Sequence, residues 1–506
     1  MNLGSIFTRH ARYRPDHLAL VFEDQRLTWR QFNANINRAA NALLGLGVHK
    51  GDKVATVLPN CPELLEMYWA CAKIGAVVVP MSTLLMDGAL RSLLRDSDST
   101  VLVTATAFAD MVERIRADLP AIPAERMLLV DGEREGFVSY HALMDAASAA
   151  EPPDMGVGLD DPFNIMYSSG TTGLPKGIVH THAIRLAYCT SFAAAYRMTP
   201  ECVTMHAGAI VFNGAFVDMM PTVFQGGTYV LRPSFYAEDY IDTIKQEQVT
   251  HVMMVPAQII AMLDAPNFEP AELQSLEMIL SLGAPLLMEH KERLTQALPG
   301  RFYELYGLTE GVITVLDKYD YSKKPGSVGT PLPLFTISIL DETGQELPPG
   351  QVGEIAGDSP LITPGYYKRP DLTEQAIVDG VMRTGDMGYV DEDGFLYLVD
   401  RKKDMIISGG VNVYPRDIEE IVVQHPAVKE VAVFGVPHAK WGETPLAAVT
   451  LLEGQNVTPE ELKDWINQRV EAKFQRVSGV DIHSDFPRNA AGKTLKREMR
   501  AAYLED

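Results

Sequence analysis

The chain has 506 residues, 46% of them apolar and 22% charged, which is ordinary composition for a globular protein with a large core. Its formal net charge is -22 and no cluster of Lys or Arg stands out, which argues against a nucleic-acid-binding protein. At roughly 100–200 residues per domain, the chain should fold as two to four units.

Cysteine usage and terminal signals point to the cytoplasm. The four cysteines include no CxxC pair, so neither a disulfide framework nor a zinc site is predicted. The N-terminus lacks the basic-then-apolar order of a signal peptide, and no uncharged apolar run reaches about 18 residues. We therefore expect a cytoplasmic protein with no transmembrane segment.

The first part of the chain alternates between helical and extended patterns. Residues 28–50 predict an amphipathic helix that Gly45 and Gly47 end. The stretches that continue the alternation are 51–60 (strand), 61–76 (helix), 77–81 (strand), 228–233 (strand), 241–249 (helix) and 250–257 (strand). This β-α-β rhythm predicts parallel sheets covered by helices.

The pattern changes after about residue 325. Alternating residues with turns at Asp341–Gly344 and Asp391–Gly394 predict hairpins. From Asp404 on, we expect a compact α+β unit in which Thr458 and Glu461 form a helix capping box. The predicted fold is α/β: a large N-terminal domain (1–400) of mostly parallel β-sheets covered by helices plus a β-rich subdomain, then a small mobile α+β C-terminal domain (401–506).

The stretch "YSSGTTGLPKG" (167–177) packs three glycines, two serines and two threonines around one lysine. It is not a Walker A loop, because Lys176 follows Pro175 and the flanks 163–167 and 178–182 both read as strands. A β-β connection offers no helix dipole, so phosphate would have to bind to backbone amides and hydroxyls. The alternative is a flexible surface linker.

Four further motifs follow along the chain: "YGLTE" (306–310), "RTGDMGY" (383–389), "DRKKDMIISGGVNVYP" (400–415) and "PRNAAGKTLKRE" (487–498). Each alone is common. Together and in this order, they resemble the acyl-adenylate-forming superfamily of acyl-CoA synthetases, nonribosomal-peptide adenylation domains and luciferases. The resemblance covers nearly the whole chain and implies a hinge between a large and a small domain.

The resemblance assigns roles residue by residue. The ATP phosphate loop would comprise Ser168, Ser169, Gly170, Thr171, Thr172, Gly173 and Lys176. The adenine pocket would be walled by Gly283, Ala284, Pro285, Glu304, Leu305, Tyr306 and Gly307. The ribose contacts would be Asp386 and Arg401. The α-phosphate and Mg²⁺ contacts would be Thr309 and Glu310, with Thr172 as a further metal ligand. The remaining matches are the adenylation lysine Lys493, the thiol-tunnel glycines Gly409 and Gly410, and the hinge residue Lys403.

The implied chemistry needs these groups. A carboxylate is a poor acyl donor, and attack on the α-phosphorus of ATP converts its oxygen into part of a leaving group, AMP. Lys493, magnesium held by Glu310 and the loop amides, with Lys176, would offset the repulsion between two anions. No general base is needed, because the nucleophile is already ionised. His180 and His182, predicted to lie on one strand face, are expected to be structural rather than metal ligands.

The acid pocket is the least constrained part of the prediction. In relatives the stretch before the glycines at 226–227 lines this pocket and often carries a histidine, but Val211 stands there and His206 is five residues too early. The predicted lining is Val211, Phe212, Asn213, Gly214, Ala215 and Met219. An ordinary helix-and-strand core is the alternative. An apolar pocket favours a medium or long fatty acid, a branched acid or an aromatic acid.

The leading prediction is an AMP-forming carboxylic acid–CoA ligase that uses ATP, Mg²⁺ and coenzyme A. The alternatives are an adenylating enzyme that loads a carrier protein, a non-catalytic nucleotide-binding protein and a luciferase-like oxygenase. No acidic residue clearly stands where an amino-acid-activating domain would anchor an ammonium group. The expected partners are small molecules and not nucleic acid, with homodimer formation left open.

Overall fold

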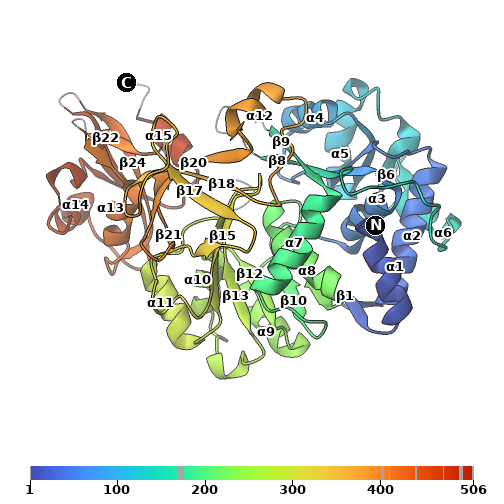
Figure 1. The fold of residues 1–506 in the computed structure, drawn as a ribbon, viewed down its shortest axis with the longest axis horizontal. Helices are drawn as coiled ribbons and strands as arrows, with labels where there is room; N and C mark the ends of the chain where they lie inside the picture. Colours follow the sequence, from blue (N-terminus) through green and yellow to red (C-terminus); the bar gives the residue numbers. More distant parts are fainter. Residues whose placement is uncertain are drawn as a thin grey trace.

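The computed structural model describes residues 2–168, 176–401, 404–408, 411–438, 441–470, 472–488 and 494–503. Four β-sheets organise these residues (Figure 1). Two large, mostly parallel sheets belong to the first 331 residues, and two smaller, mostly antiparallel sheets follow. The predicted α/β class is thereby confirmed.

The first large sheet has seven strands in the order β7-β6-β5-β3-β4-β8-β9. Its strands are β3 (Lys53–Val57), β4 (Val77–Pro80), β5 (Ser99–Thr104), β6 (Met127–Leu129), β7 (Val138–Ser139), β8 (Pro162–Ser168) and β9 (Lys176–Thr181). The helices of this region are α1 (Gly4–Tyr13), α2 (Trp29–Gly45), α3 (Pro62–Ile74), α4 (Asp87–Asp96), α5 (Thr106–Ile115) and α6 (Tyr140–Ala146). Helix α2 begins at a capping box between Thr28 and Gln31.

The second large sheet has nine strands in the order β16-β15-β14-β13-β12-β10-β11-β1-β2. Its strands are β1 (Leu18–Phe22), β2 (Gln25–Thr28), β10 (Val203–His206), β11 (Thr228–Leu231), β12 (His251–Met254), β13 (Met278–Ser281), β14 (Phe302–Gly307), β15 (Ile313–Leu316) and β16 (Thr330–Pro331). Its helices are α7 (His182–Ala195), α8 (Phe216–Gln225), α9 (Ala237–Glu247), α10 (Pro256–Asp264) and α11 (Met288–Ala297).

The predicted hairpins form the third sheet. Its strands are β17 (Thr336–Leu340), β18 (Gly353–Asp358), β19 (Ile377–Val378), β20 (Val381–Val390) and β21 (Leu396–Arg401), beside helix α12 (Pro370–Ala376). Both pairs foreseen from the sequence, β17 with β18 and β20 with β21, are antiparallel.

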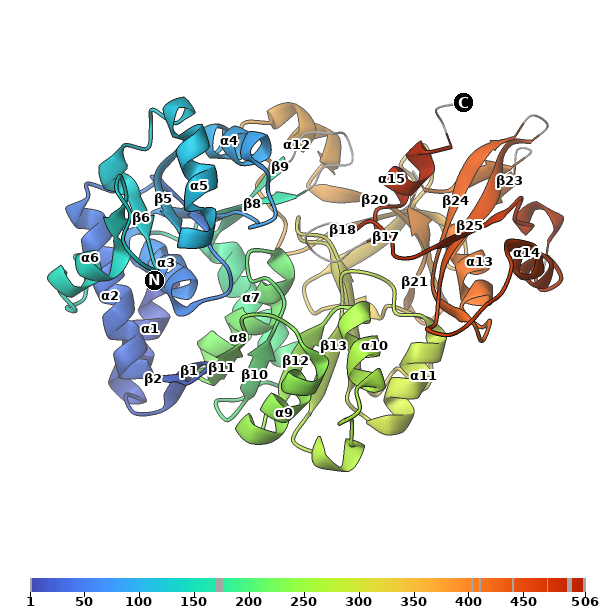
Figure 2. The same cartoon turned by 180° about the vertical axis from the view of Figure 1, so that it is seen from behind.

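The fourth sheet begins after residue 404 and lies at the opposite end of the molecule from α1 to α6 (Figures 1 and 2). Its strands are β22 (Ile406–Ser408), β23 (Val411–Val413), β24 (Val428–His438), β25 (Gly442–Leu451) and β26 (Val480–His483). Its helices are α13 (Pro415–Val422), α14 (Pro459–Asn467) and α15 (Lys496–Ala501). The predicted capping box of Thr458 and Glu461 starts α14.

The largest hydrophobic core joins the two large sheets. Phe163 of the seven-stranded sheet, Tyr229 and Leu280 of the nine-stranded sheet, and Phe192 and Phe216 of α7 and α8 all belong to it. Helices α7 and α8 lie side by side in both views (Figures 1 and 2). Among the described residues, no helix has the combined length and hydropathy that crossing a membrane requires.

Candidate functional site

The predicted phosphate loop joins two antiparallel strands. In the pairing of β8 with β9, Ser168 is opposite Lys176, so the loop leaves and re-enters the sheet at adjacent positions. This confirms the prediction that the loop connects two β-strands. The other predicted loop residues, Ser169, Gly170, Thr171, Thr172 and Gly173, lie outside the described residues.

One tyrosine joins the end of this loop to the predicted metal ligand. The Lys176 ammonium lies 4.7 Å from the centre of the Tyr366 ring, within cation–π range. The Tyr366 hydroxyl donates a hydrogen bond of 2.9 Å to Glu310 Oε1. Lys176 and Glu310, which are far apart in the sequence, therefore meet at the same side chain.

Glu310 is carried by a tight turn after β14. The amide of Leu308 donates to the carbonyl of Val312 at 3.0 Å, which closes the turn. Gly311 has a φ of 123°, and a Cβ there would lie 2.3 Å from the carbonyl oxygen of Leu361. Only glycine fits this position, because both the dihedral and the space exclude a side chain. The turn therefore fixes the backbone direction of Glu310.

The pKa of the Glu310 carboxyl is raised above its ordinary value. Burial is the largest cause, and the charge of Asp386 adds to it. The Tyr366 hydrogen bond and the Lys176 charge act in the opposite direction. A bound metal cation would favour the charged form of this carboxyl, against the effect of burial.

Thr309 is held through its backbone. The ring of His180, fully buried, contacts the Thr309 carbonyl oxygen through Nε2 at 2.9 Å. Burial and then the charge of Arg185 push the pKa of His180 well below its ordinary value, so the ring is neutral. His180 thus has a structural contact, in line with its predicted role.

His182 does not lie on the strand where the sequence predicted it. It is the first residue of α7 rather than the last of a strand, because Thr181 caps that helix. Its Nδ1 accepts from the Leu3 amide at 3.3 Å. The two histidines therefore do not share a strand face. Within the described residues, no group of three or more His, Cys, Asp or Glu side chains could hold a metal ion.

The two predicted walls of the adenine pocket follow neighbouring strands. Ser281 at the end of β13 pairs in parallel with Glu304 of β14, so residues 282–285 and 304–307 lie at one edge of the sheet. Such edges are where ligands bind in parallel sheets. The Glu304 carboxylate forms a buried ion pair with Lys291 of α11, which turns this side chain toward the helix.

The predicted ribose contacts are neighbours across two strands. Asp386 of β20 is paired directly with Arg401 of β21. Asp386 is 8% exposed, and its Oδ2 accepts a hydrogen bond of 2.9 Å from the Tyr306 hydroxyl. Tyr306 belongs to the predicted adenine wall, so the adenine and ribose positions are connected by a direct contact.

The predicted acid pocket divides into two parts. Val211, Ala215 and Met219 belong to the large core. Phe212, Asn213 and Gly214 are partly exposed just before α8. A Cβ on Gly214 would lie 3.2 Å from Leu282, so this stretch borders the adenine wall.

His206, which lies five residues before Val211, belongs to the core. Its Nδ1 lies 3.2 Å from Oδ2 of Asp218, and both side chains are fully buried. The predictions for Lys403, Gly409, Gly410 and Lys493 concern positions outside the described residues, and only the backbone of Arg401 is described.

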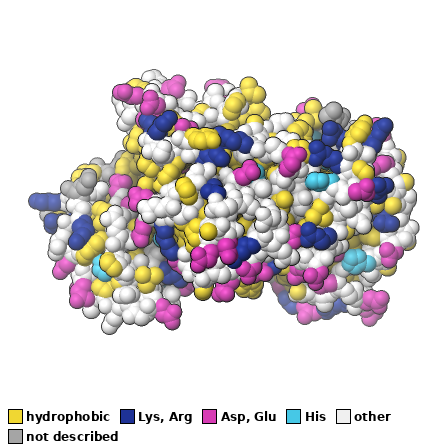
Figure 3. Space-filling view, turned by 90° about the horizontal axis from the view of Figure 1, so that it is seen from below, with side chains coloured by type: hydrophobic (Ala, Val, Ile, Leu, Met, Phe, Trp, Pro, Cys, Tyr) yellow, Lys and Arg dark blue, Asp and Glu magenta, His cyan; other side chains and the backbone are white. Residues whose placement is uncertain are grey.

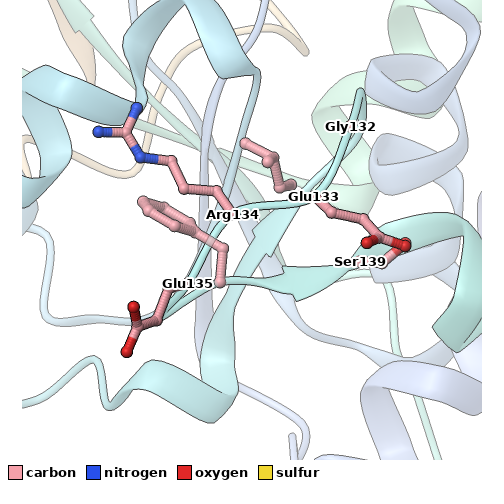
Figure 4. A pocket seen from close by; sticks show the side chains of 7 residues that line it. Gly132, Glu133, Arg134, Glu135 and Ser139 are labelled. Atoms are coloured by element: carbon pink, nitrogen blue, oxygen red, sulfur yellow. The ribbon is translucent and has the colours of Figure 1, made fainter.

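Two hollows lie on the surface: one is remote from the predicted site residues and the other lies beside Tyr366. The one in Figure 4, about 390 Å³, is lined by the 132–139 segment at the β7 end of the seven-stranded sheet, opposite β8 and β9. The carboxylates of Glu133 and Glu135 point apart there, so they offer no convergent site. The other, about 440 Å³, lies beside Val179 and Tyr366. The face in Figure 3 mixes acidic and basic side chains.

Three residues of this region were not predicted from the sequence: Tyr366, Lys291 and Arg185. Tyr366 stands in the stretch "PGYYKRP", where nothing distinguishes it from Tyr367. Lys291 and Arg185 lie inside helices, where a charged residue ordinarily reaches solvent. An arginine in the mostly apolar helix "HAIRLAYCTSFAAA" was the one available signal.

These features define an α/β protein whose predicted nucleotide-binding residues, where described, gather at the edges of its sheets. The AMP-binding enzyme family model matches residues 7–367, and the AMP-binding enzyme C-terminal domain model matches residues 417–493. The chain belongs to the AMP-binding enzyme family.

Its relatives match it from end to end. The chain is 35% identical to a feruloyl-CoA synthase of an Amycolatopsis species, over 99% of each chain. It is 33% identical to a long-chain-fatty-acid–CoA ligase of Mycobacterium tuberculosis, over 99% of this chain and 98% of the relative. Its structure is similar to that of ATP-bound MatB from Rhodopseudomonas palustris, with a TM-score of 0.91, 30% identity and coverage of 100% and 99%.

Proposed function

We propose that this protein is an ATP-dependent, AMP-forming carboxylic acid–CoA ligase. The observation that carries the proposal is the meeting of Lys176 and Glu310 at Tyr366, beside the adenine wall and the Asp386 position. Similarity to CoA ligases along the whole chain supports the same reaction class.

The first half-reaction would join the acid to the α-phosphate of ATP. A carboxylate oxygen forms the new bond to phosphorus, and the bond to pyrophosphate breaks. Lys176, at the end of the loop, would hold the β- and γ-phosphates, and Lys493 would offset charge on the α-phosphate and the acid. The nucleophile needs no general base, because it is ionised at neutral pH.

Magnesium would be held by Glu310, with Thr172 as a further ligand. One Glu310 oxygen accepts from Tyr366, and carboxylate oxygens are ligands that magnesium prefers. Magnesium bound there supplies charge neutralisation on the phosphates. The Tyr366 hydrogen bond would keep the carboxylate in one orientation toward the ion.

The second half-reaction would transfer the acyl group to the thiol of CoA, releasing AMP. We propose domains of residues 1–400 and 401–506, with a hinge near Lys403 and the thiol passing Gly409 and Gly410. The separate sheets before and after residue 404, and the two separate family models, support this division. We expect the protein to act in the cytoplasm, where ATP and CoA are supplied. Light scattering would show whether it forms a homodimer.

The acid would be aromatic or fatty. The stretch 211–219 is apolar apart from Asn213 and Asp218, and Asp218 faces the core rather than the pocket. The names of the two relatives favour a phenylpropenoic acid or a long-chain acid. An amino acid is disfavoured, since an ammonium group would need an exposed carboxylate there.

A pyrophosphate-release screen tests the proposal. Purified protein, ATP and magnesium would be mixed with a panel of aromatic, branched and fatty acids, with and without CoA, and thioesters identified by mass spectrometry. Acid-dependent pyrophosphate with CoA thioester is the expected result. Adenylate formation without transfer to free CoA would favour a carrier-protein ligase. Oxygen uptake would favour a luciferase-like enzyme. The absence of acid-dependent pyrophosphate would favour a non-catalytic nucleotide-binding protein.

A further inference from the structure

Arg185 of α7 is a fully buried cation between the acid pocket and the nucleotide site. Its side chain has no exposed surface. Among the residues that the structure describes, its hydrogen-bond partners are all neutral: Asn164 Oδ1 at 2.9 Å, Asn213 Oδ1 at 2.8 Å, His180 Nδ1 at 3.2 Å and Met166 Sδ at 3.5 Å. Among the described residues, no carboxylate forms an ion pair with it.

An unpaired buried cation is costly, which makes a purely structural role a poor explanation. Burial lowers the pKa of Arg185 to about 10, so the group remains charged at neutral pH. The rings of Phe216 and Tyr188, whose centres lie 4.1 and 4.8 Å from the guanidinium carbon, stabilise the charge in part. A neutral side chain would fill the same space without the desolvation cost.

On one side, Arg185 determines how His180 is protonated. The Arg185 guanidinium and the Asn164 amide both donate to His180 Nδ1, so that nitrogen is the acceptor. The ring proton is then on Nε2, which donates to the carbonyl of Thr309 at 2.9 Å. The backbone that carries Thr309 and Glu310 is therefore two hydrogen bonds from Arg185.

On the other side, Arg185 orients Asn213 of the predicted acid pocket. The guanidinium donates a hydrogen bond to the Asn213 carbonyl oxygen, and the Asn213 amide nitrogen donates to the Tyr188 hydroxyl at 2.9 Å. Both ends of the carboxamide are thus fixed. A cation on the carbonyl oxygen also polarises the amide and strengthens it as a donor.

We propose that Arg185 is a positioning residue that couples the acid pocket at Asn213 to the turn that carries Thr309 and Glu310, while its unneutralised charge favours a carboxylate in that pocket. This inference rests on the proposed ligase function. Arg185 does not touch the substrate, since it has no exposed surface, and acts through Asn213 and His180.

Three variants test the coupling. Arg185→Met removes the charge and the hydrogen bonds, Arg185→Lys keeps the charge but not the planar fork, and Cys189→Ala is a packing control at another fully buried position of α7. For Arg185→Met, kcat/KM for the acid in adenylation should fall roughly 10²-fold, and the magnesium concentration for half-maximal adenylation should rise about threefold or more, because the turn that carries Thr309 and Glu310 loses its link to Arg185. Arg185→Lys should recover about tenfold of this loss.

A double-mutant cycle separates coupling from packing. If Arg185 acts through Asn213, adding Asn213→Ala to the Arg185→Met enzyme should lower kcat/KM for the acid much less than Asn213→Ala lowers it in the wild-type enzyme. If the two residues act independently, the fold losses of the single variants should multiply in the double variant. Should Arg185→Met not fold, Arg185→Lys with Asn213→Ala supplies the same cycle. The inference would be wrong, and the proposed function untouched, if the kinetics of Arg185→Met matched those of Cys189→Ala, or if the fold losses multiplied in the double variant. Wild-type protein without acid-dependent pyrophosphate release would overturn the proposed function and the inference with it.

Discussion

At the scale of single residues, one feature of the site is that one tyrosine contacts the predicted metal ligand Glu310 and a second tyrosine contacts the predicted ribose contact Asp386. Tyr366 donates to Glu310, and Tyr306 donates to Asp386. A phenol orients a carboxylate without neutralising it, whereas a lysine or arginine in the same place would compete with a metal ion or a ribose hydroxyl. The Tyr366 hydroxyl therefore orients Glu310 without removing its negative charge.

Glu310→Gln should raise the magnesium concentration needed for half-maximal adenylation by about tenfold, because the amide keeps the shape but loses the charge. The measurement is acid-dependent pyrophosphate release against magnesium concentration. Glu342→Gln, an exposed position in the β17–β18 turn, is the matched control. A magnesium titration identical to that of the control would reject Glu310 as a ligand.

The raised pKa of Glu310 gives this site a pH dependence. As the pH falls through a value above the ordinary glutamate range, the carboxyl takes up a proton and binds magnesium less well. Magnesium demand should therefore rise at acidic pH. Tyr366→Phe should move this rise to higher pH, because it removes a hydrogen bond that favours the charged form. Superimposable pH profiles would contradict this reasoning.

Lys493→Ala should affect adenylation selectively. Removing one oriented positive charge from the transition state should slow acid-dependent pyrophosphate formation by roughly 10²–10³. Thioester formation from pre-made acyl-adenylate should continue at a near-normal rate. Equal losses in both half-reactions would show that Lys493 is not specific to adenylation.

At the scale of elements, the β8–β9 hairpin brings Lys176, at the end of the predicted phosphate loop, to the tyrosine that contacts Glu310. The sheet holds both ends of the loop, since Ser168 pairs with Lys176. Lys176 should therefore act on the phosphates farthest from the ribose. Lys176→Ala should weaken ATP use about tenfold and change AMP binding little. AMP affinity would be measured by calorimetric titration and ATP use by kinetics. A folding defect would reduce both the AMP affinity and the ATP use.

Much of this arrangement could be predicted from the sequence because local patterns encode it. Alternating residues and turn residues gave the hairpins, and the β-β reading of the loop's flanks is correct. Contacts between segments that are distant in the sequence could not be predicted. Nothing local shows that Tyr366 meets Lys176 and Glu310, or that Lys291 reaches Glu304, because tertiary packing decides these pairs. His182 was assigned to a strand because its helix has few polar residues to mark its start.

At the scale of the whole molecule, the two half-reactions would need two arrangements of the small domain. Lys403→Pro should separate them, because proline fixes φ near −65° and also restricts Lys402. Adenylate should form at a near-normal rate, since the ATP and acid residues belong mostly to the large domain. Thioester formation should fall at least about tenfold, or roughly 1.4 kcal/mol.

Single-turnover pyrophosphate release and thioester appearance, followed in one preparation, measure both steps of the Lys403→Pro enzyme. Loss of both steps with intact folding would mean that the variant is held in the other arrangement. Unchanged rates would mean that the pivot lies elsewhere.

The pairing of Asp386 with Arg401 bears on the geometry of such a rotation. Strand β21 ends at Arg401, two positions before the proposed pivot. In any rotation about a fixed axis, displacement grows with distance from the axis. A nucleoside held at this strand end would stay almost still while residues far along the small domain sweep long arcs. The adenylate could then remain bound through the changeover, so that a reactive mixed anhydride is not lost to water between the two steps.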